Sequence, residues 1–168
     1  MKKLALLMLM AVLVLGLIVS VVVARGPSNR ATGSVWLDHG DTWNRYVEFD
    51  AHAARDGRPA KGTIYWYQWK GSQEWYETSP SHVVEVKYVE VDIDTAWFAG
   101  PGSDGRWLVM KVCDVGTPAS DGDEVSAVWV LDESTAKNVV ETVGDLSGGT
   151  VYEYGLIGGN LVVHYYEE

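Results

Sequence analysis

Four carboxylates follow one another along a short stretch of the chain and could bind a calcium ion. They belong to Asp114, Asp121, Asp123 and Glu124. Calcium in proteins takes about 6–8 oxygen ligands, and carboxylates are prominent among them. The spacing is not that of an EF-hand, so the alternative is a turn in which Asp114 and Asp123 accept backbone N–H bonds, as Asp often does. The sequence favours the turn and leaves Asp114, Asp121 and Asp123 as candidate calcium ligands.

Two histidines are candidates for polar sites. Asn160 and His164 are four residues apart, so on a strand they share one face, and a hydrogen-bonded structural pair is expected. His39 lies between Asp38 and Asp41 but has no second histidine nearby. Because zinc sites need three or four placed ligands, we expect a solvated loop around His39.

The sequence offers little for catalysis. Two carboxylate pairs, Glu48 with Asp50 and Asp92 with Asp94, have the spacing of neighbours on one strand face. A glycosidase needs two carboxyls about 5–10 Å apart that face a sugar from opposite sides. Cys113 lies in a strand-like run without a histidine near it, and is expected to be a small buried hydrophobe. No G-x-S-x-G, H-E-x-x-H or P-loop motif is present, so the sequence weighs against an enzyme.

The aromatic residues are the stronger signal. The chain has eight Trp and nine Tyr but only two Phe. Trp and Tyr combine a large apolar ring with a polar atom, which suits half-exposed positions and interfaces. On a strand, Tyr65, Tyr67 and Trp69 point to one face and Trp66 to the other, and Trp75 follows shortly after. We expect Tyr65, Tyr67, Trp69 and Trp75 to form a patch for a sugar ring, a peptide or a partner protein; the alternative is that all these rings are packed.

Short strands must position these residues. Apolar and polar residues alternate in runs that are separated by turn dipeptides such as Asp56-Gly57, a pattern typical of half-buried strands joined by hairpins. One short helix is expected over residues 134–143, with Ser134 or Thr135 as its cap. The expected strands cover residues 47–51, 63–69, 83–93, 96–99, 107–113, 125–131, 151–154 and 161–166.

Antiparallel strands in this number must protect their edges. Closure into a barrel removes the edges, and packing of two sheets is the other solution. Because consecutive strands have hairpin spacing, the sequence predicts a single all-β domain over residues 34–168, an antiparallel up-and-down β-barrel of about eight strands. A β-sandwich is the alternative.

The N-terminus predicts export. Residues 4–24 are apolar without a charge between Lys3 and Arg25. Such a segment after a basic start is typical of a signal peptide, whose apolar region is about 7–15 residues long, but about 20 apolar residues also suffice for a membrane-spanning helix. Residues 1–24 are therefore a cleaved signal or a retained anchor, and residues 25–33 are a linker. Either way the domain is expected outside the cytoplasm, secreted or anchored.

The net charge limits the kinds of partner, and the cysteine content limits the disulfides that the chain can form. The formal net charge is −10, which repels phosphate backbones and argues against nucleic acid as a partner. Membrane contact is expected only through residues 4–24, if they are not cleaved. With one cysteine, the chain cannot form an internal disulfide.

Four motifs occur in a fixed order along the chain. They are YVEFDAH at residues 46–52, DTAWFAG at 94–100, KVCDVGTP at 111–118 followed by Gly122-Asp123, and GGNLVVH at 158–164. In this order they resemble a small secreted β-rich module of bacterial surface and exported proteins, a family of unknown function. The resemblance spans residues 33 to 166, and the chain departs from it in its many Trp residues and in Ala119-Ser120-Asp121 before Gly122. It implies an exported β architecture and transfers no catalytic residues.

These observations rank three functions. The first is a non-catalytic binding or interaction module of the cell envelope, with an envelope protein, a glycan or a small apolar ligand as its partner. The second is a small-ligand carrier, since a closed barrel of about eight strands can hold one small molecule. The third is a secreted hydrolase. No cofactor is expected other than a weakly indicated calcium ion.

Overall fold

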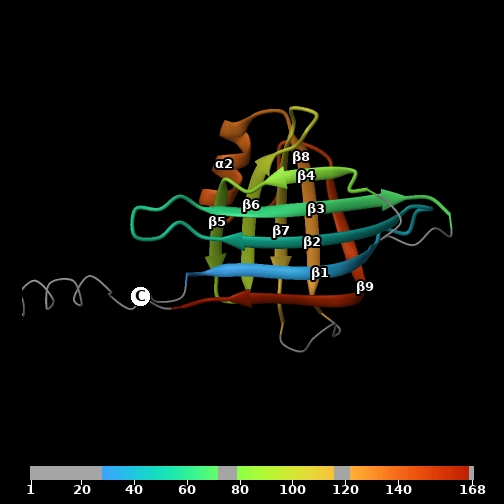
Figure 1. Ribbon diagram of the computed structural model, residues 1–168, viewed down its shortest axis with the longest axis horizontal. Coiled ribbons are helices and arrows are strands. Elements are labelled where there is room, and N and C mark those ends of the chain that lie inside the picture. The colour runs from blue at the N-terminus through green and yellow to red at the C-terminus, as the bar shows by residue number, and fades with distance from the viewer. Residues whose placement is uncertain (1–27, 72–78, 116–121, 167–168) are drawn as a thin grey trace, which may run out of the picture.

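The computed structural model describes residues 28–71, 79–115 and 122–166 (Figure 1). The apolar segment 4–24, Trp75 and Asp121 lie outside these residues. No helix in the described ranges is long and apolar enough to span a bilayer. The elements are β1 (Arg30–Asp38), β2 (Asn44–His52), β3 (Lys61–Trp69), β4 (His82–Glu85), β5 (Tyr88–Asp92), β6 (Thr95–Pro101), β7 (Trp107–Cys113), β8 (Glu124–Val130), α2 (Glu133–Glu141) and β9 (Val151–His164).

The strands form one antiparallel sheet that folds into two layers. The hydrogen-bonded order is β4-β3-β2-β1-β9-β8-β7-β6-β5. The strands β1–β4 cross the strands β5–β8 at a steep angle (Figure 1). Residues 151–155 of β9 pair with β8 and residues 155–164 pair with β1, so β9 bends from one layer into the other. The predicted antiparallel all-β architecture is confirmed, and consecutive strands pair with each other except for β4 and β5.

The prediction of a closed barrel was wrong. The sheet ends at β4 and β5, which are joined only by Val86 and Lys87. Val86 donates its N–H to the Gly62 carbonyl of β3 at 3.0 Å, and Lys87 donates to the Ala99 carbonyl of β6 at 2.8 Å. The chain therefore turns a corner between the layers instead of reversing into a hairpin, and β4 and β5 do not pair. Two layers linked by such corners agree with the sandwich alternative, in its steeply crossed form.

The core lies between the two layers. Strand alternation sends every second side chain inward, and the rings of Phe49 and Phe98 meet across the layers with centroids 5.2 Å apart. The largest fully buried side chains there include Phe98, Leu37, Ile64, Leu108, Met110 and Leu161. These side chains fill the space in which a barrel-type carrier would hold its ligand.

The short predicted helix is confirmed as α2. It begins at Glu133, and its cap is Asp132 instead of Ser134 or Thr135, with the Asp132 carboxylate accepting the Thr135 N–H at 2.9 Å. Its apolar side packs on the outer face of the β5–β8 layer. The residues of this second cluster are Trp97, Ala99, Val109, Val128, Val130, Ala136, Val139 and Val140.

Strand β1 was not predicted. It begins at Arg30, inside the segment expected as a linker, so residues 30–33 belong to the sheet. One of its inward positions must be glycine because it faces a large ring: a Cβ on Gly33 would lie 2.4 Å from the Phe49 ring. The two strands expected at 151–154 and 161–166 are one strand, β9, which ends at His164.

Candidate functional site

An aromatic cluster lies on the outer face of the layer that contains β1–β3. It consists of Trp36, Tyr46, Tyr67 and Trp69. The register pairs Trp36 with Tyr46 and Tyr46 with Tyr67, so the three side chains stand in one row across the strands. Ring centroids are 5.1 Å apart for Trp36 and Tyr46, and 5.8 Å for Tyr46 and Tyr67. Trp69 packs edge-on against Trp36 at 5.8 Å.

The predicted patch residues differ in exposure. Tyr65 is 39% exposed, whereas Trp69 is only 7% exposed because it packs against Trp36. Tyr67 is half-buried, and Trp75 lies outside the described residues. Tyr65 and Tyr67 therefore belong to a broader surface than the sequence indicated.

Sequence reasoning missed two members of this surface. Trp36 was overlooked because β1 was not predicted as a strand, and Tyr46 because it directly precedes the run expected as a strand at 47–51. A usable signal was present in the sequence around Tyr46. Tyr46, Glu48 and Asp50 alternate with apolar residues, which extends the strand by two residues and puts Tyr46 on the outer face.

A chain of hydrogen bonds continues from the aromatic cluster along β2. The Tyr46 hydroxyl contacts Ser34 Oγ at 2.5 Å and donates to a Glu48 carboxylate oxygen at 3.0 Å. Burial raises the pKa of Tyr46, and burial together with Glu48 raises that of Tyr67. Both phenols are thus neutral at physiological pH, and Tyr46 holds Glu48 in a fixed orientation.

A shallow depression of about 390 Å³ lies beside Tyr65. Ser34, Glu48 and Tyr65 form one row across the three strands, and Asp50 pairs with Thr63 in the next row. Short side chains leave the surface low here, while the Tyr65 ring forms a wall. We call this surface the Tyr65 depression; it is lined by Gly33, Ser34, Glu48, Phe49, Asp50, Gly62, Thr63 and Tyr65.

The two carboxylates of the depression do not form a hydrolytic pair. Glu48 and Asp50 are two residues apart on one face of β2, as predicted, so they lie side by side. Asp50 Oδ1 lies 2.9 Å from His52 Nε2, and Glu48 accepts the Tyr46 hydroxyl. Of the other predicted pair, Asp92 ends β5, and Asp94 accepts a hydrogen bond from Thr95 Oγ1 at 2.9 Å in the adjoining turn.

A second hollow, of about 380 Å³, lies where β1 ends and β2 begins. We call it the loop cleft. Trp36 belongs both to this cleft and to the aromatic cluster. Trp43 is 37% exposed, and the Lys70 ammonium lies 4.5 Å from its ring centroid in a cation–π contact. The cleft is lined by Trp36, Leu37, Asp38, Asp41, Thr42, Trp43, Asn44, Arg45, Gly71 and Ile157.

A buried arginine shapes the loop cleft. Arg45 is only 5% exposed, and its guanidinium donates to both oxygens of Asp41, at 2.8 Å and 2.6 Å. The Trp43 N–H donates to the same carboxylate at 2.9 Å, and the Tyr154 ring lies 5.5 Å from the guanidinium carbon. The Arg45 hydrogen bonds, followed by the Trp43 N–H, hold the pKa of Asp41 far below its ordinary value of 3.8. This ion pair therefore fixes the loop that carries Trp43.

The Asp41–Arg45 pair predicts a pH-dependent stability difference. Since the pKa of Asp41 is lowered in the folded state, its contribution is present above the ordinary value of 3.8 and is lost as the pH falls toward the folded-state pKa. We expect Asp41→Asn to lower the urea midpoint at pH 7 and at pH 5, and the difference from wild type to shrink at pH 3. Urea unfolding at the three pH values checks this, and a difference that grows in acid would contradict it.

His39 and His164 pack against aromatic rings, while the expected hydrogen bond between Asn160 and His164 stays a prediction. His39 Nδ1 donates to the Glu153 carbonyl at 2.9 Å, and its ring packs against Tyr152 and Tyr154. His164 stacks on Tyr166, with ring centroids 6.4 Å apart. In the parts of the chain that the structure describes, no group of three or more His, Cys, Asp or Glu residues could hold a metal ion.

The candidate calcium loop is described only at its two ends. Asp123 accepts the Val115 N–H at 3.1 Å, and Asp114 accepts the Val163 N–H at 3.0 Å. Both carboxylates thus bind backbone N–H groups, but the Asp114 partner belongs to β9 and not to a local turn, and the loop between the two ends lies outside the described residues. Asp121 is outside the described residues, so calcium binding stays a prediction. Cys113 is half-buried and accepts a hydrogen bond from Thr95 Oγ1 at 3.4 Å, so it is less buried than expected.

Comparison with known proteins gives no family or relative for this chain, so its function must be inferred from its own residues. The aromatic cluster contacts residues of the Tyr65 depression and shares Trp36 with the loop cleft. The resemblance to secreted β-rich modules stays a prediction. No protein-family model, no curated protein and no solved structure matches this chain.

Proposed function

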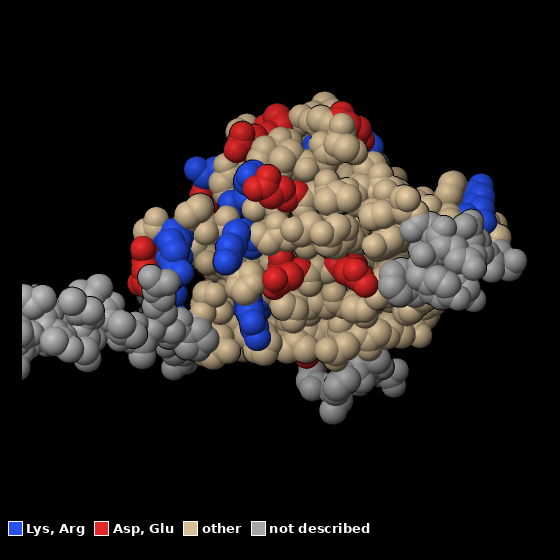
Figure 2. Space-filling model, viewed as in Figure 1, with Lys and Arg blue, Asp and Glu red and all other residues tan. Residues whose placement is uncertain are grey.

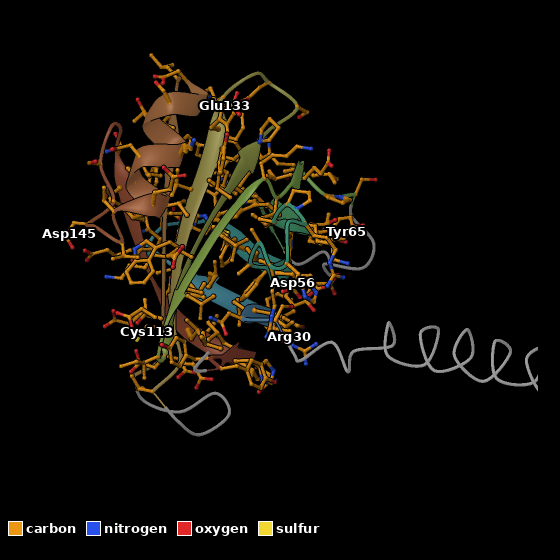
Figure 3. The ribbon with its side chains drawn as sticks, turned by 90° about the vertical axis from the view of Figure 1, so that its left-hand side faces the viewer. Arg30, Asp56, Tyr65, Cys113, Glu133 and Asp145 are labelled. Atoms are coloured by element: carbon orange, nitrogen blue, oxygen red, sulfur yellow. The ribbon has the colours of Figure 1, made fainter. Side chains whose placement is uncertain are left out.

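We propose that this chain is an exported, non-catalytic binding module of the cell envelope, and that the outer face of β1–β3 is its binding surface. The observation that supports this most is an asymmetry between the two layers. Helix α2 packs on the outer face of β5–β8, whereas no described helix or strand packs on the outer face of β1–β3. Figure 3 shows Tyr65 on the side of the molecule away from α2.

The composition of this face favours binding. Figure 2 views it directly: uncharged surface dominates, acidic side chains lie near its middle, and basic ones lie mostly on the left, with another at the right-hand end. Exposed aromatic rings beside polar groups are typical of interaction sites. Here Tyr65 and Trp43 are the exposed rings, at the two ends of the surface, and Trp36 and Tyr67 lie between them.

Export is the part of the proposal that rests on sequence alone. Lys2 and Lys3 precede the apolar residues 4–24, and this order directs the following domain out of the cytoplasm whether the segment is cleaved or retained. The described domain begins at Ser28, close behind that segment. We therefore place the domain outside the cytoplasm, secreted or anchored.

The two other functions have less support. The carrier requires an interior cavity, but side chains such as Phe98 and Met110 occupy the space between the layers. The hydrolase requires carboxyls on opposite sides of a cleft, whereas Glu48 and Asp50 lie side by side on β2.

The surface predicts a matched pair of variants. We expect Tyr65→Ala to weaken retention of the full chain on isolated cell envelopes about tenfold, because a stacked aromatic ring contributes about 0.5–1.5 kcal/mol beyond the area it buries. Tyr165 is a suitable control, since it is 41% exposed against 39% for Tyr65 but follows the end of β9. Cosedimentation with envelopes measures both variants. Equal retention of wild type and Tyr65→Ala would contradict the proposed surface.

A further inference from the structure

We infer that the two hollows and the aromatic cluster form one extended groove for a glycan whose sugar units are uncharged or carry amino groups. This inference rests on the proposed function and names the ligand class of the same surface. It depends on the contacts that link the two hollows, on the length of the groove, on its rings and on its charge.

The two hollows are connected by contacts through the aromatic cluster. Trp36 lines the loop cleft and also contacts Tyr46 in the aromatic cluster. The Tyr46 hydroxyl bonds to Ser34 and Glu48, and both of these residues line the Tyr65 depression. These contacts link the two hollows along β1 and β2, with the Tyr46 ring buried between them.

The length of the path suits a short polymer better than a single small molecule. On β2 it extends from Asn44, which lines the loop cleft, to Asp50, which lines the Tyr65 depression. At about 3.4 Å per residue this is about 20 Å. Each hollow alone has the size of a site for a small ligand. A ligand that fills both must be extended along the strands.

The rings are placed for stacking at intervals along this path. Tyr65 stands at one end, Trp36 and Tyr67 are half-buried in the middle, and Trp43 is exposed at the other end. A sugar ring offers an apolar face of C–H groups to an aromatic ring and hydroxyls at its edge, which matches side chains with an apolar body and a polar atom. Tyr46 and Trp69 are buried beneath this surface and support it.

The charged side chains that line the groove are mainly carboxylates. Glu48 and Asp50 lie at the Tyr65 end and Asp38 at the loop cleft, while the Arg45 charge is neutralised by Asp41. Ionised carboxylates only accept hydrogen bonds, so they fit ligands that donate from hydroxyl or amino groups. Phosphates and uronic acids would meet like charge, which is unfavourable. Lys70 beside Trp43 is a basic group in this region and lies at the far end.

The test compares oligosaccharides of matched length and different charge. Full-length protein is titrated with oligomers of two to six units of N-acetylglucosamine, glucosamine or galacturonic acid, and binding is followed by calorimetry. We expect affinity to rise with length up to about the span of 20 Å. We also expect the galacturonate series to bind at least tenfold more weakly at low salt, with a smaller gap at high salt because exposed charges are screened.

The variants locate the two ends of the site. Trp43→Ala and Tyr65→Ala are each expected to remove the gain in affinity that the longer oligomers show, while short oligomers keep most of theirs. Tyr165→Ala is the control and should leave the length dependence unchanged. Thermal melting of each variant shows that it is folded.

Three outcomes would overturn the inference. One is galacturonate binding as tightly as the neutral or amino series, and another is affinity that does not change with length. The third combines two results. No oligosaccharide binds, although Tyr65→Ala still reduces retention on envelopes; and retention of the wild-type protein is abolished by protease treatment of the envelopes but not by periodate treatment. In that case the proposed surface stands with a protein partner, whereas unchanged retention of Tyr65→Ala would remove the proposed function as well.

Discussion

Gly159→Ala is expected to lower the free energy of unfolding by at least about 3 kcal/mol, the upper end of the usual cost of overpacking. Gly159 lies in β9 with φ of +110°, a conformation that other residues rarely adopt. A Cβ there would lie 2.1 Å from the Ser34 carbonyl oxygen and 2.7 Å from the Val35 Cα, and both are backbone atoms of the paired strand β1. No side-chain rotation can relieve these contacts, so β1 and β9 would have to separate.

The neighbouring residue is the matched control. Gly158 has space for a methyl group, since its nearest contact would be the Trp36 ring at 3.8 Å. We expect Gly158→Ala to change the free energy of unfolding by less than about 0.5 kcal/mol, as is usual at surface positions. Urea unfolding of both variants measures the difference. Equal stability of the two would show that β9 does not approach β1 as closely as described.

Gly159 also shows what the sequence could not reveal about the fold. Alternation predicted most of the strands, because half-buried strands repeat every two residues. It did not predict the corners at which the sheet passes between layers. At one of them the β1–β9 register shifts between Trp36 and Leu37, which leaves Ile157 as an extra, exposed residue of β9. A bulge of this kind depends on the partner strand, and the partner, β1, is far away in the sequence.

The candidate site was predicted in part for the same reason. Residue parity correctly separates Tyr65, Tyr67 and Trp69 from the inward-facing Trp66. Odd or even position along a strand cannot tell which of the outward-facing rings becomes buried, because that depends on the residues of neighbouring strands. Trp69 is covered because Trp36 lies beside it, whereas Tyr65, which lies between Glu48 and Val83, has no aromatic neighbour in its row.

Phe98→Ala is the second variant with a large expected effect, a loss of about 3–5 kcal/mol in the free energy of unfolding. Phe98 is fully buried on β6 and meets the Phe49 ring from the other layer at 5.2 Å. Removing the ring takes away apolar contacts and leaves a cavity that backbone strands on both sides cannot easily close. Phe98→Leu keeps most of the volume and should cost less than about 1.5 kcal/mol.

The same variant distinguishes a packed interior from a carrier's cavity. Small apolar molecules bind in dry cavities left by large-to-small substitutions, and a ligand that binds only the folded state raises the melting temperature. Because Phe98 and its neighbours fill the space between the layers, benzene should stabilise Phe98→Ala and leave wild type and Phe98→Leu unchanged. A rise in the melting temperature of wild type would instead reveal an interior site and restore the carrier function. If wild type does not respond, the outer face of β1–β3 is where ligands should be sought.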